Sequence, residues 1–146
     1  MNKKIGKRHP AGRYECLRLL QKHMGISNMI IIAFSLNTSK ILPRIFCRHF
    51  RHCAVIIPQI GAHSELHLYQ FLRRKQIARL SLKCRDINVL RGHGWRFLYI
   101  PGDITVPKDA MRAMTCVNFT KRVIGMHAPL VQTPDALYRR LIYMLK

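Results

Sequence analysis

Apolar and polar residues alternate through much of the stretch from residue 51 to residue 101, and such alternation is typical of β-strands. The run Arg51–Pro58 is short, rich in β-branched residues and stopped by proline. The run His63–Phe71 alternates after a turn that contains Gly61, so the two runs make a plausible antiparallel pair. Two further runs, Ile77–Lys83 and Trp95–Pro101, have the same character. The pattern predicts three or four strands.

The pattern changes to helical spacing in the last third of the chain. Phe119, Val123 and Ile124 follow Cys116 in an amphipathic segment that Gly125 should terminate. A final helix is expected after Thr133, with this threonine as its N-cap and a proline at its first position. A single helical turn is also expected within "RDINVLRGHG", with Asp86 as its N-cap. These elements predict an α+β fold, a small antiparallel sheet with the cysteine-bearing helix packed against it.

The first 45 residues differ from the rest. Weak helical spacing is followed by a β-like segment, "NMIIIAFSL", and a polar turn. We therefore divide the chain into a basic N-terminal extension, residues 1–45, whose structure the pattern leaves open, and an α+β domain, residues 46–146. At 146 residues the chain is long enough for one domain with a core of its own.

The charge of the chain is strongly positive. Against 26 lysine and arginine residues stand six acidic ones, which gives a formal net charge of +20. Such a field attracts polyanions, so nucleic acid, anionic lipid and acidic protein surfaces are candidate partners. Because the positive residues are spread along the whole chain, the charge indicates the surroundings of the protein rather than its mechanism.

The cysteines and the apolar runs bear on location. Five cysteines form an odd count without the regular spacing of a disulfide framework, which favours a reduced, cytoplasmic setting. The longest apolar run, Met29–Leu36, is far shorter than the roughly 20 residues that a membrane span requires. The basic N-terminus has an interrupted apolar stretch and makes a poor signal peptide. We expect no membrane span.

Cys116 is the residue on which a functional interpretation depends. On this reading it begins a helix, where free backbone N–H groups and the helix dipole stabilise a thiolate. A nucleophilic cysteine also needs an imidazole, and His52 shares a strand face with Ala54 and Ile56, where a polar ring is costly without a partner. Three polar residues on the next strand are candidates to orient that imidazole, His67 first, then Glu65, and also His63.

The segments "FRHCAVIIP", "HLYQF", "WRFLYIP", "MTCVNFTKRVIG" and "TPDALYRRL" together resemble the circularly permuted branch of the papain-like cysteine hydrolases. This branch includes NlpC-type permuted enzymes and relatives of lecithin:retinol acyltransferase, and the nearest impression is of small phage- or prophage-associated members. The resemblance covers residues 46–145. It implies a strand histidine followed by a helix cysteine, and so a catalytic Cys116, His52 and His67 acting on an acyl or peptide substrate without a cofactor or a metal.

Other interpretations of the same residues stay open. A cysteine on a helix is often a small apolar core residue. The cluster "CRHFRHC", with Cys47, His49, His52 and Cys53, contains zinc-ligand types but has no second pair downstream, and no metal is expected there. The main alternative function is non-enzymatic binding of nucleic acid. Its expected groove combines basic residues with aromatic platforms, namely Arg73–Lys75, Lys121–Arg122, Arg139–Arg140, Tyr69, Phe71 and Trp95.

Overall fold

The computed structural model describes residues 28–37, 49–59, 65–72, 76–102 and 105–146 of the chain. Several residues singled out from the sequence lie outside these ranges. They are Cys16, Cys47, His63 and the basic run Arg73–Lys75. The predicted structure of residues 1–27 lies outside them as well.

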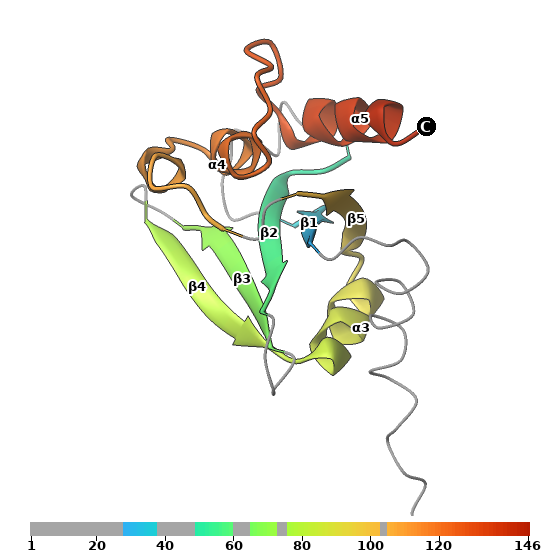
Figure 1. The fold of residues 1–146 in the computed structure, drawn as a ribbon. Helices are drawn as coiled ribbons and strands as arrows, with labels where there is room; N and C mark the ends of the chain where they lie inside the picture. The colour runs from blue at the N-terminus through green and yellow to red at the C-terminus, as the bar shows by residue number, and fades with distance from the viewer. Residues whose placement is uncertain (1–27, 38–48, 60–64, 73–75, 103–104) are drawn as a thin grey trace, which may run out of the picture.

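The described strands form one five-stranded sheet in which all neighbours are antiparallel, in the order β4-β3-β2-β1-β5. Figure 1 shows this sheet between α3 on one side and the pair α4 and α5 on the other. The strands are β1 (Met29–Ser35), β2 (His52–Pro58), β3 (Leu66–Phe71), β4 (Ile77–Leu82) and β5 (Arg96–Pro101). The predicted α+β fold is confirmed, and the expected pairing of the second and third strands is present.

The strand β1 lies inside the sheet, between β2 and β5. All seven of its residues are buried, because side chains on both of its faces are covered. This explains why "MIIIAFS" is continuously apolar rather than alternating, as is usual for a strand covered on both sides. The sheet therefore extends upstream of residue 46, and the predicted boundary there does not separate β1 from the domain.

In the described part of the chain, four helical elements follow or interrupt the strands. They are α3 (Cys84–Gly92), the 3₁₀ turn η3 (Ala110–Arg112), α4 (Cys116–Val123) and α5 (Pro134–Met144). The expected Thr133 cap of α5 is confirmed, since its side chain accepts a hydrogen bond from the N–H of Ala136. The prediction of a single helical turn capped by Asp86 is wrong, because residues 84–92 form a nine-residue helix whose N-cap is Lys83. Asp86 lies inside it, and its carboxylate accepts the N–H of Lys83.

The sheet buries both faces, and we name each face after the helix that covers it. The α4 face carries the larger apolar core, into which α4 and α5 insert Val117, Phe119 and Leu137. The α3 face carries a smaller core, in which Ile87 of α3 packs over alternate residues of the strands. In β2 the odd-numbered residues face α4 and the even-numbered ones face α3, as the alternation of a strand requires.

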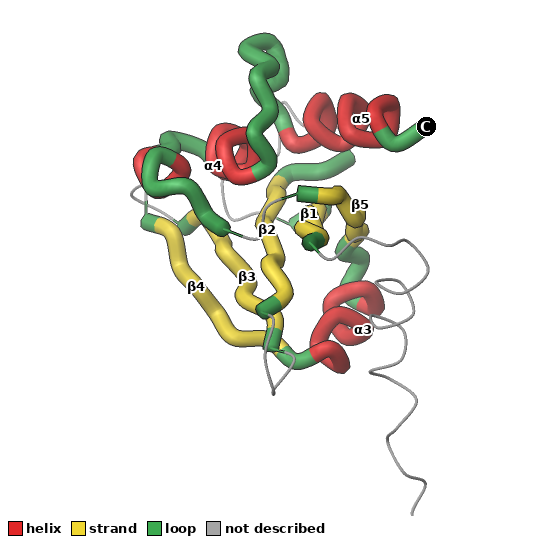
Figure 2. The backbone as a smooth tube through the Cα atoms, in the orientation of Figure 1, coloured by secondary structure: helices red, strands yellow, loops and turns green. Residues whose placement is uncertain are grey.

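A buried lysine holds the segment that joins α4 to α5, drawn in green between the two helices in Figure 2. Lys121 is only 7% exposed, and its Nζ donates hydrogen bonds to the carbonyls of Ala128 at 2.9 Å and Val131 at 2.8 Å. The helix α4 ends at Val123, two residues before Gly125, whose φ of 66° is a left-handed conformation that favours glycine. These contacts fix the C-terminal end of the helix that begins with Cys116.

Candidate active site

Cys116 is the first residue of α4, as the sequence predicts. The preceding residue, Thr115, is extended, and its hydroxyl accepts a hydrogen bond of 3.1 Å from the N–H of Asn118. This capping contact begins the helix sharply, so that the side chain of Cys116 lies at the positive end of the helix dipole. The side chain is half-buried and packs against the core of the α4 face.

His52 is the first residue of β2 and pairs with Ser35 of β1. Its ring lies edge-on to the ring of Trp95, with 6.3 Å between the ring centres. The chain just before it is held by α5, because the carboxylate of Asp135 accepts the backbone N–H groups of His49 and Phe50. Each half of the site thus depends on one helix. The helix α4 carries the thiol, and α5 holds the backbone that precedes His52.

The pKa of the Cys116 thiol is lowered well below its usual range. The largest cause is a hydrogen bond from the side chain of Cys53, and a hydrogen bond and positive charge from His52 act in the same direction. Burial opposes these effects, because it disfavours the charged thiolate, but it does not outweigh them. The structure therefore brings together the predicted nucleophile and the predicted base, and it adds a second cysteine to them.

The imidazole of His52 has no third residue to orient it among the described parts of the chain. Its Nε2 atom is buried and has no hydrogen-bond partner there. Packing against Trp95 is the contact that limits the orientation of the ring. The site accordingly contains a cysteine whose pKa His52 helps to lower, without the complete hydrogen-bonded chain of a catalytic triad.

His67, the favoured third member, is not close to His52. It pairs with Ile57, five residues along β2 from His52, which corresponds to about 17 Å of strand. Its Nε2 lies 4.0 Å from a carboxylate oxygen of Glu65, the second choice, and Glu65 also accepts from the hydroxyl of Ser81. The register of the sheet thus separates these residues from the cysteine and directs them toward each other.

Two residues near the site were missed by sequence reasoning. Cys53 follows His52 and points to the opposite face, toward α4, where its sulfur lies 3.6 Å from the hydroxyl of Thr120. Gln70 pairs with Ala54 and so lies on the same face as His52, as its diagonal neighbour on β3. The alternation of "RHCAV" placed Cys53 toward the helix, but only the register of β3 identifies Gln70.

The basic residues that follow Cys116 do not surround its thiolate. Lys121 binds the two carbonyls described above, and a guanidinium N–H of Arg122 donates to the carbonyl of Asp109. Neither of them contributes to the lowered pKa of Cys116, whereas His52 does.

The aromatic residues of the predicted nucleic-acid groove pack against the cores of the sheet, and its basic run Arg73–Lys75 lies outside the described residues. Phe71 is 5% exposed and belongs to the core of the α4 face, where Tyr69 also packs. Trp95 packs on the other face.

For the cluster "CRHFRHC", the described residues contain no group of three or more histidine, cysteine or acidic side chains that could hold a metal ion. In the same residues, no helix combines the length and apolar character needed to cross a membrane.

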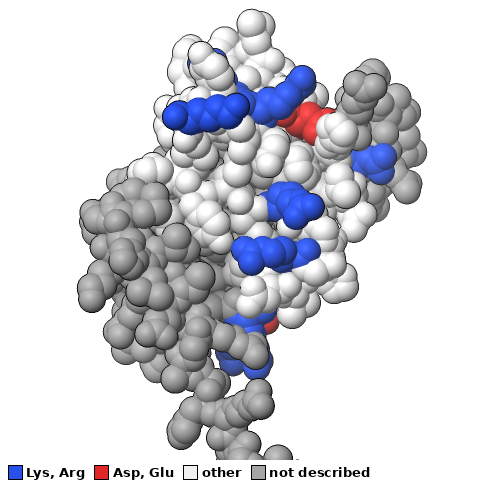
Figure 3. Space-filling model, turned by 90° about the vertical axis from the view of Figure 1, so that its right-hand side faces the viewer, with Lys and Arg blue, Asp and Glu red and all other residues white. Residues whose placement is uncertain are grey.

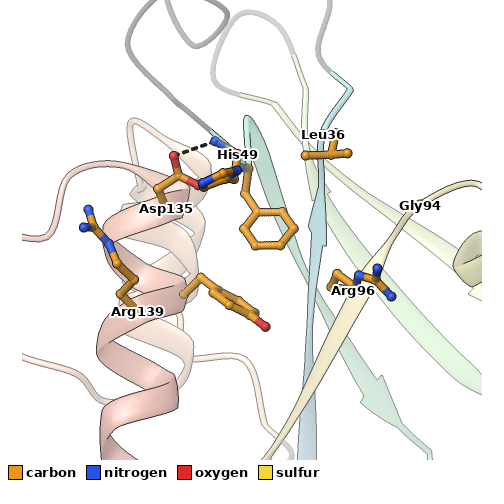
Figure 4. Close-up of a pocket in the computed structure, with 8 residues that line it drawn as sticks. Leu36, His49, Gly94, Arg96, Asp135 and Arg139 are labelled. Carbon is orange, nitrogen blue, oxygen red and sulfur yellow. Dashed lines mark hydrogen bonds between the residues drawn. The ribbon is translucent and has the colours of Figure 1, made fainter.

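A pocket of about 550 Å³ opens at the end of the sheet where β2 begins with His52. Figure 4 shows α5 on one side of it, with Asp135 and Arg139, and on the other side Leu36, which directly follows β1, and Arg96 of β5. Its other lining residues are His49, Phe50, Gly94 and Tyr138. Neither Cys116 nor His52 lines this pocket, although Arg96 and Cys53 pair with opposite sides of Phe34, which places their backbones about 10 Å apart.

No protein-family model, curated protein or solved structure matches the chain.

Proposed function

We propose that the protein is a cysteine hydrolase, a peptidase, amidase or esterase, in which Cys116 is the nucleophile and His52 the acid–base residue. The observation that carries the proposal is the lowered pKa of a thiol at a helix N-terminus, to which a histidine at the start of β2 contributes. Perturbed titration in a paired nucleophile and base is typical of active sites, whereas a purely structural cysteine needs neither the low pKa nor the imidazole. The resemblance to permuted papain-like enzymes supports the same assignment.

The reaction proceeds through an acyl-enzyme. The Cys116 thiolate attacks an acyl carbonyl and forms a carbon–sulfur bond, while the imidazolium of His52 gives its proton to the departing amine or alcohol. Neutral His52 then takes a proton from a water molecule, whose oxygen attacks the thioester. The carbon–sulfur bond breaks, the carboxylic acid leaves, and the thiolate–imidazolium pair is restored. An alcohol or amine in place of water would make the same site an acyltransferase.

Gln70 is the best candidate for a positioning residue in this mechanism. It shares the α3 face with His52 and is its diagonal neighbour across the β2–β3 pair. Diagonal pairs on adjacent strands lie within reach of long side chains. An amide oxygen that accepts the N–H of the imidazole would fix the ring while it carries the positive charge. Its contribution should appear as a lower kcat in Gln70→Ala and a partial recovery in Gln70→Glu.

The direct test is acylation by p-nitrophenyl acetate, followed by mass spectrometry of the intact protein and of its cysteine peptides. We expect one acetyl group on Cys116, formed in a burst and then lost by hydrolysis. His52→Ala should slow the burst by at least about a hundred-fold, the usual contribution of a general base. Cys53→Ala should leave the acetyl group on Cys116 and should slow its formation only as far as the pKa of that thiol rises, because it removes the neighbouring thiol but not the nucleophile. Acetylation spread evenly over the cysteines, or unaffected by His52→Ala, would contradict the proposal.

A further inference from the structure

Exposed arginines line the edge of the sheet formed by β5. Arg139 on α5 and Arg96 on β5 border the same pocket, and all three of Arg139, Arg96 and Arg91 are exposed. The guanidinium of Arg91, at the end of α3, lies 5.8 Å from the ring centre of Phe97, the residue after Arg96. We call these three residues the arginine track. Figure 3 shows the basic side chains on this side of the molecule spaced one below another, with little acidic surface between them.

The pocket interrupts the track between Arg139 and Arg96. Two aromatic rings, Phe50 and Tyr138, form its apolar lining, and their ring centres lie 4.7 Å apart. Tyr138 also meets Phe34 edge-on at 5.1 Å, so the rings are held by the core of the α4 face rather than by solvent-exposed loops. A rigid aromatic recess with a cation at each side suits a flat, apolar group that is attached to an anion.

The one acidic residue in the pocket does not cancel this charge. The carboxylate of Asp135 accepts the backbone N–H groups of His49 and Phe50, at 2.9 and 2.5 Å. It also lies in the first turn of α5, where the helix dipole compensates a negative charge. Asp135 therefore serves the fold, and the guanidinium groups of the track face the solvent without a carboxylate partner in the described residues, where the acidic ion pairs involve Glu65 and Asp86.

We propose that the arginine track binds single-stranded nucleic acid, with phosphates on Arg91, Arg96 and Arg139 and one base in the pocket against Phe50 and Tyr138. Arginine–phosphate contacts with stacking on aromatic rings are the general means by which proteins bind single strands. A duplex keeps its bases stacked inside and has none to place in a recessed pocket. An anionic membrane surface offers the phosphates but no flat ring, and it would not use the recess either.

This inference is independent of the proposed hydrolase activity, because the track and its pocket contain neither Cys116 nor His52. It also differs from the groove expected from the sequence. Of the residues of that groove, only Arg139 belongs to the track, and Arg96 and Arg91 are selected by their positions around β5.

The test is binding of a short fluorescein-labelled oligothymidylate by fluorescence anisotropy over a salt series, with the full-length chain. The double variant Arg96→Gln/Arg139→Gln should weaken binding about ten-fold at low salt. It should also reduce the slope of log affinity against log salt by about 1.4, since each lost phosphate contact removes about 0.7 for a single strand. The matched control is Arg79→Gln/Arg112→Gln, which removes the same charge from exposed residues on β4 and η3.

A third variant separates stacking from charge. Tyr138→Leu should weaken oligothymidylate binding several-fold while leaving the salt slope unchanged, and Tyr138→Phe should bind as the unaltered protein does. Thermal unfolding of each variant verifies that the chain is folded. The proposal is overturned if no binding appears at low salt or if the control variant loses as much affinity as the track variant. It is equally overturned if a duplex or phosphatidylserine vesicles bind as tightly as the single strand with the same dependence on the track.

Discussion

On the α4 face of the sheet, fourteen buried residues form a core with two helices and a 3₁₀ turn, as counted over the described residues. On the α3 face, six buried strand residues lie under a single helix, and among its residues whose burial is described only Ile87 is buried. Cys116 belongs to the first region. His52 precedes Cys53 in β2, so the alternation of the strand places its side chain on the α3 face. There its ring lies edge-on to the ring of Trp95. The nucleophile and its base are thus carried by regions of unequal packing.

The difference indicates how the site is built. A dense core fixes side chains in single conformations, so the position of the thiol is set by the packing of Val117 and Phe119 behind it. The imidazole packs edge-on against Trp95, and its Nε2 has no hydrogen-bond partner in the described residues. We infer that the thiol is rigidly placed and that the ring of His52 is the adjustable member of the pair. Substitutions on the two faces of the sheet test this difference in rigidity.

The largest effect should come from the core of the α4 face. Phe119→Ala removes a fully buried ring and should lower the free energy of unfolding by about 3–5 kcal/mol. Ile87→Ala, at the partly open edge of the other core, should cost about 2 kcal/mol, near the lower end for such substitutions. Urea unfolding of both variants measures the difference. An equal or larger cost for Ile87→Ala would show that the two faces do not differ as described.

The clamp at Lys121 should have the next largest effect. Lys121→Met leaves the carbonyls of Ala128 and Val131 without their donor, at a cost of about 1–3 kcal/mol. Amide hydrogen exchange should increase in residues 124–133. Arg122→Met serves as the control, because Arg122 is exposed and its loss should change stability by less than about 0.5 kcal/mol. If both variants behaved alike, Lys121 would not be the residue that holds this segment.

Two threonine caps provide a matched pair for the role of α4. Thr115→Ala and Thr133→Ala each remove an N-cap and should each cost about 1 kcal/mol. Only Thr115→Ala should also slow the alkylation of Cys116, because it frays the helix end that stabilises the thiolate. Thermal melts combined with iodoacetamide rates distinguish the two effects. Equal alkylation rates in both variants would remove the helix N-terminus from the explanation of the reactive thiol.

The sequence predicted the parts of this molecule that depend on local pattern. Proline-bounded alternation located β2, β3 and β5, and the Thr-Pro signal located α5, because strand periodicity and helix caps are determined by neighbouring residues. The pairing of Cys116 with His52 stays a prediction, and the effect of His52 on the pKa of the Cys116 thiol is consistent with it.

The errors concern pairing between distant segments. Nothing local shows that β1 enters between β2 and β5, so a run that is apolar throughout was assigned to an extension. Likewise, His67 and Gln70 are three residues apart on β3, and only the register with β2 determines which of them lies near His52. The sequence did not indicate the arginine track either, because the position of β5 in the sheet brings Arg91, Arg96 and Arg139 to one side of the molecule.

The most direct test of the account is the rate of Cys116 alkylation by iodoacetamide as a function of pH, followed by mass spectrometry of each cysteine peptide. Because the thiolate is the reacting form and its pKa is lowered, the rate should reach half its plateau well below pH 8.5, the region typical of a free cysteine. Cys53→Ala and His52→Ala should each move this midpoint upward, because both side chains lower the pKa of the thiol. A midpoint near 8.5 that neither substitution changes would contradict the account, and Cys116 would then be a core residue.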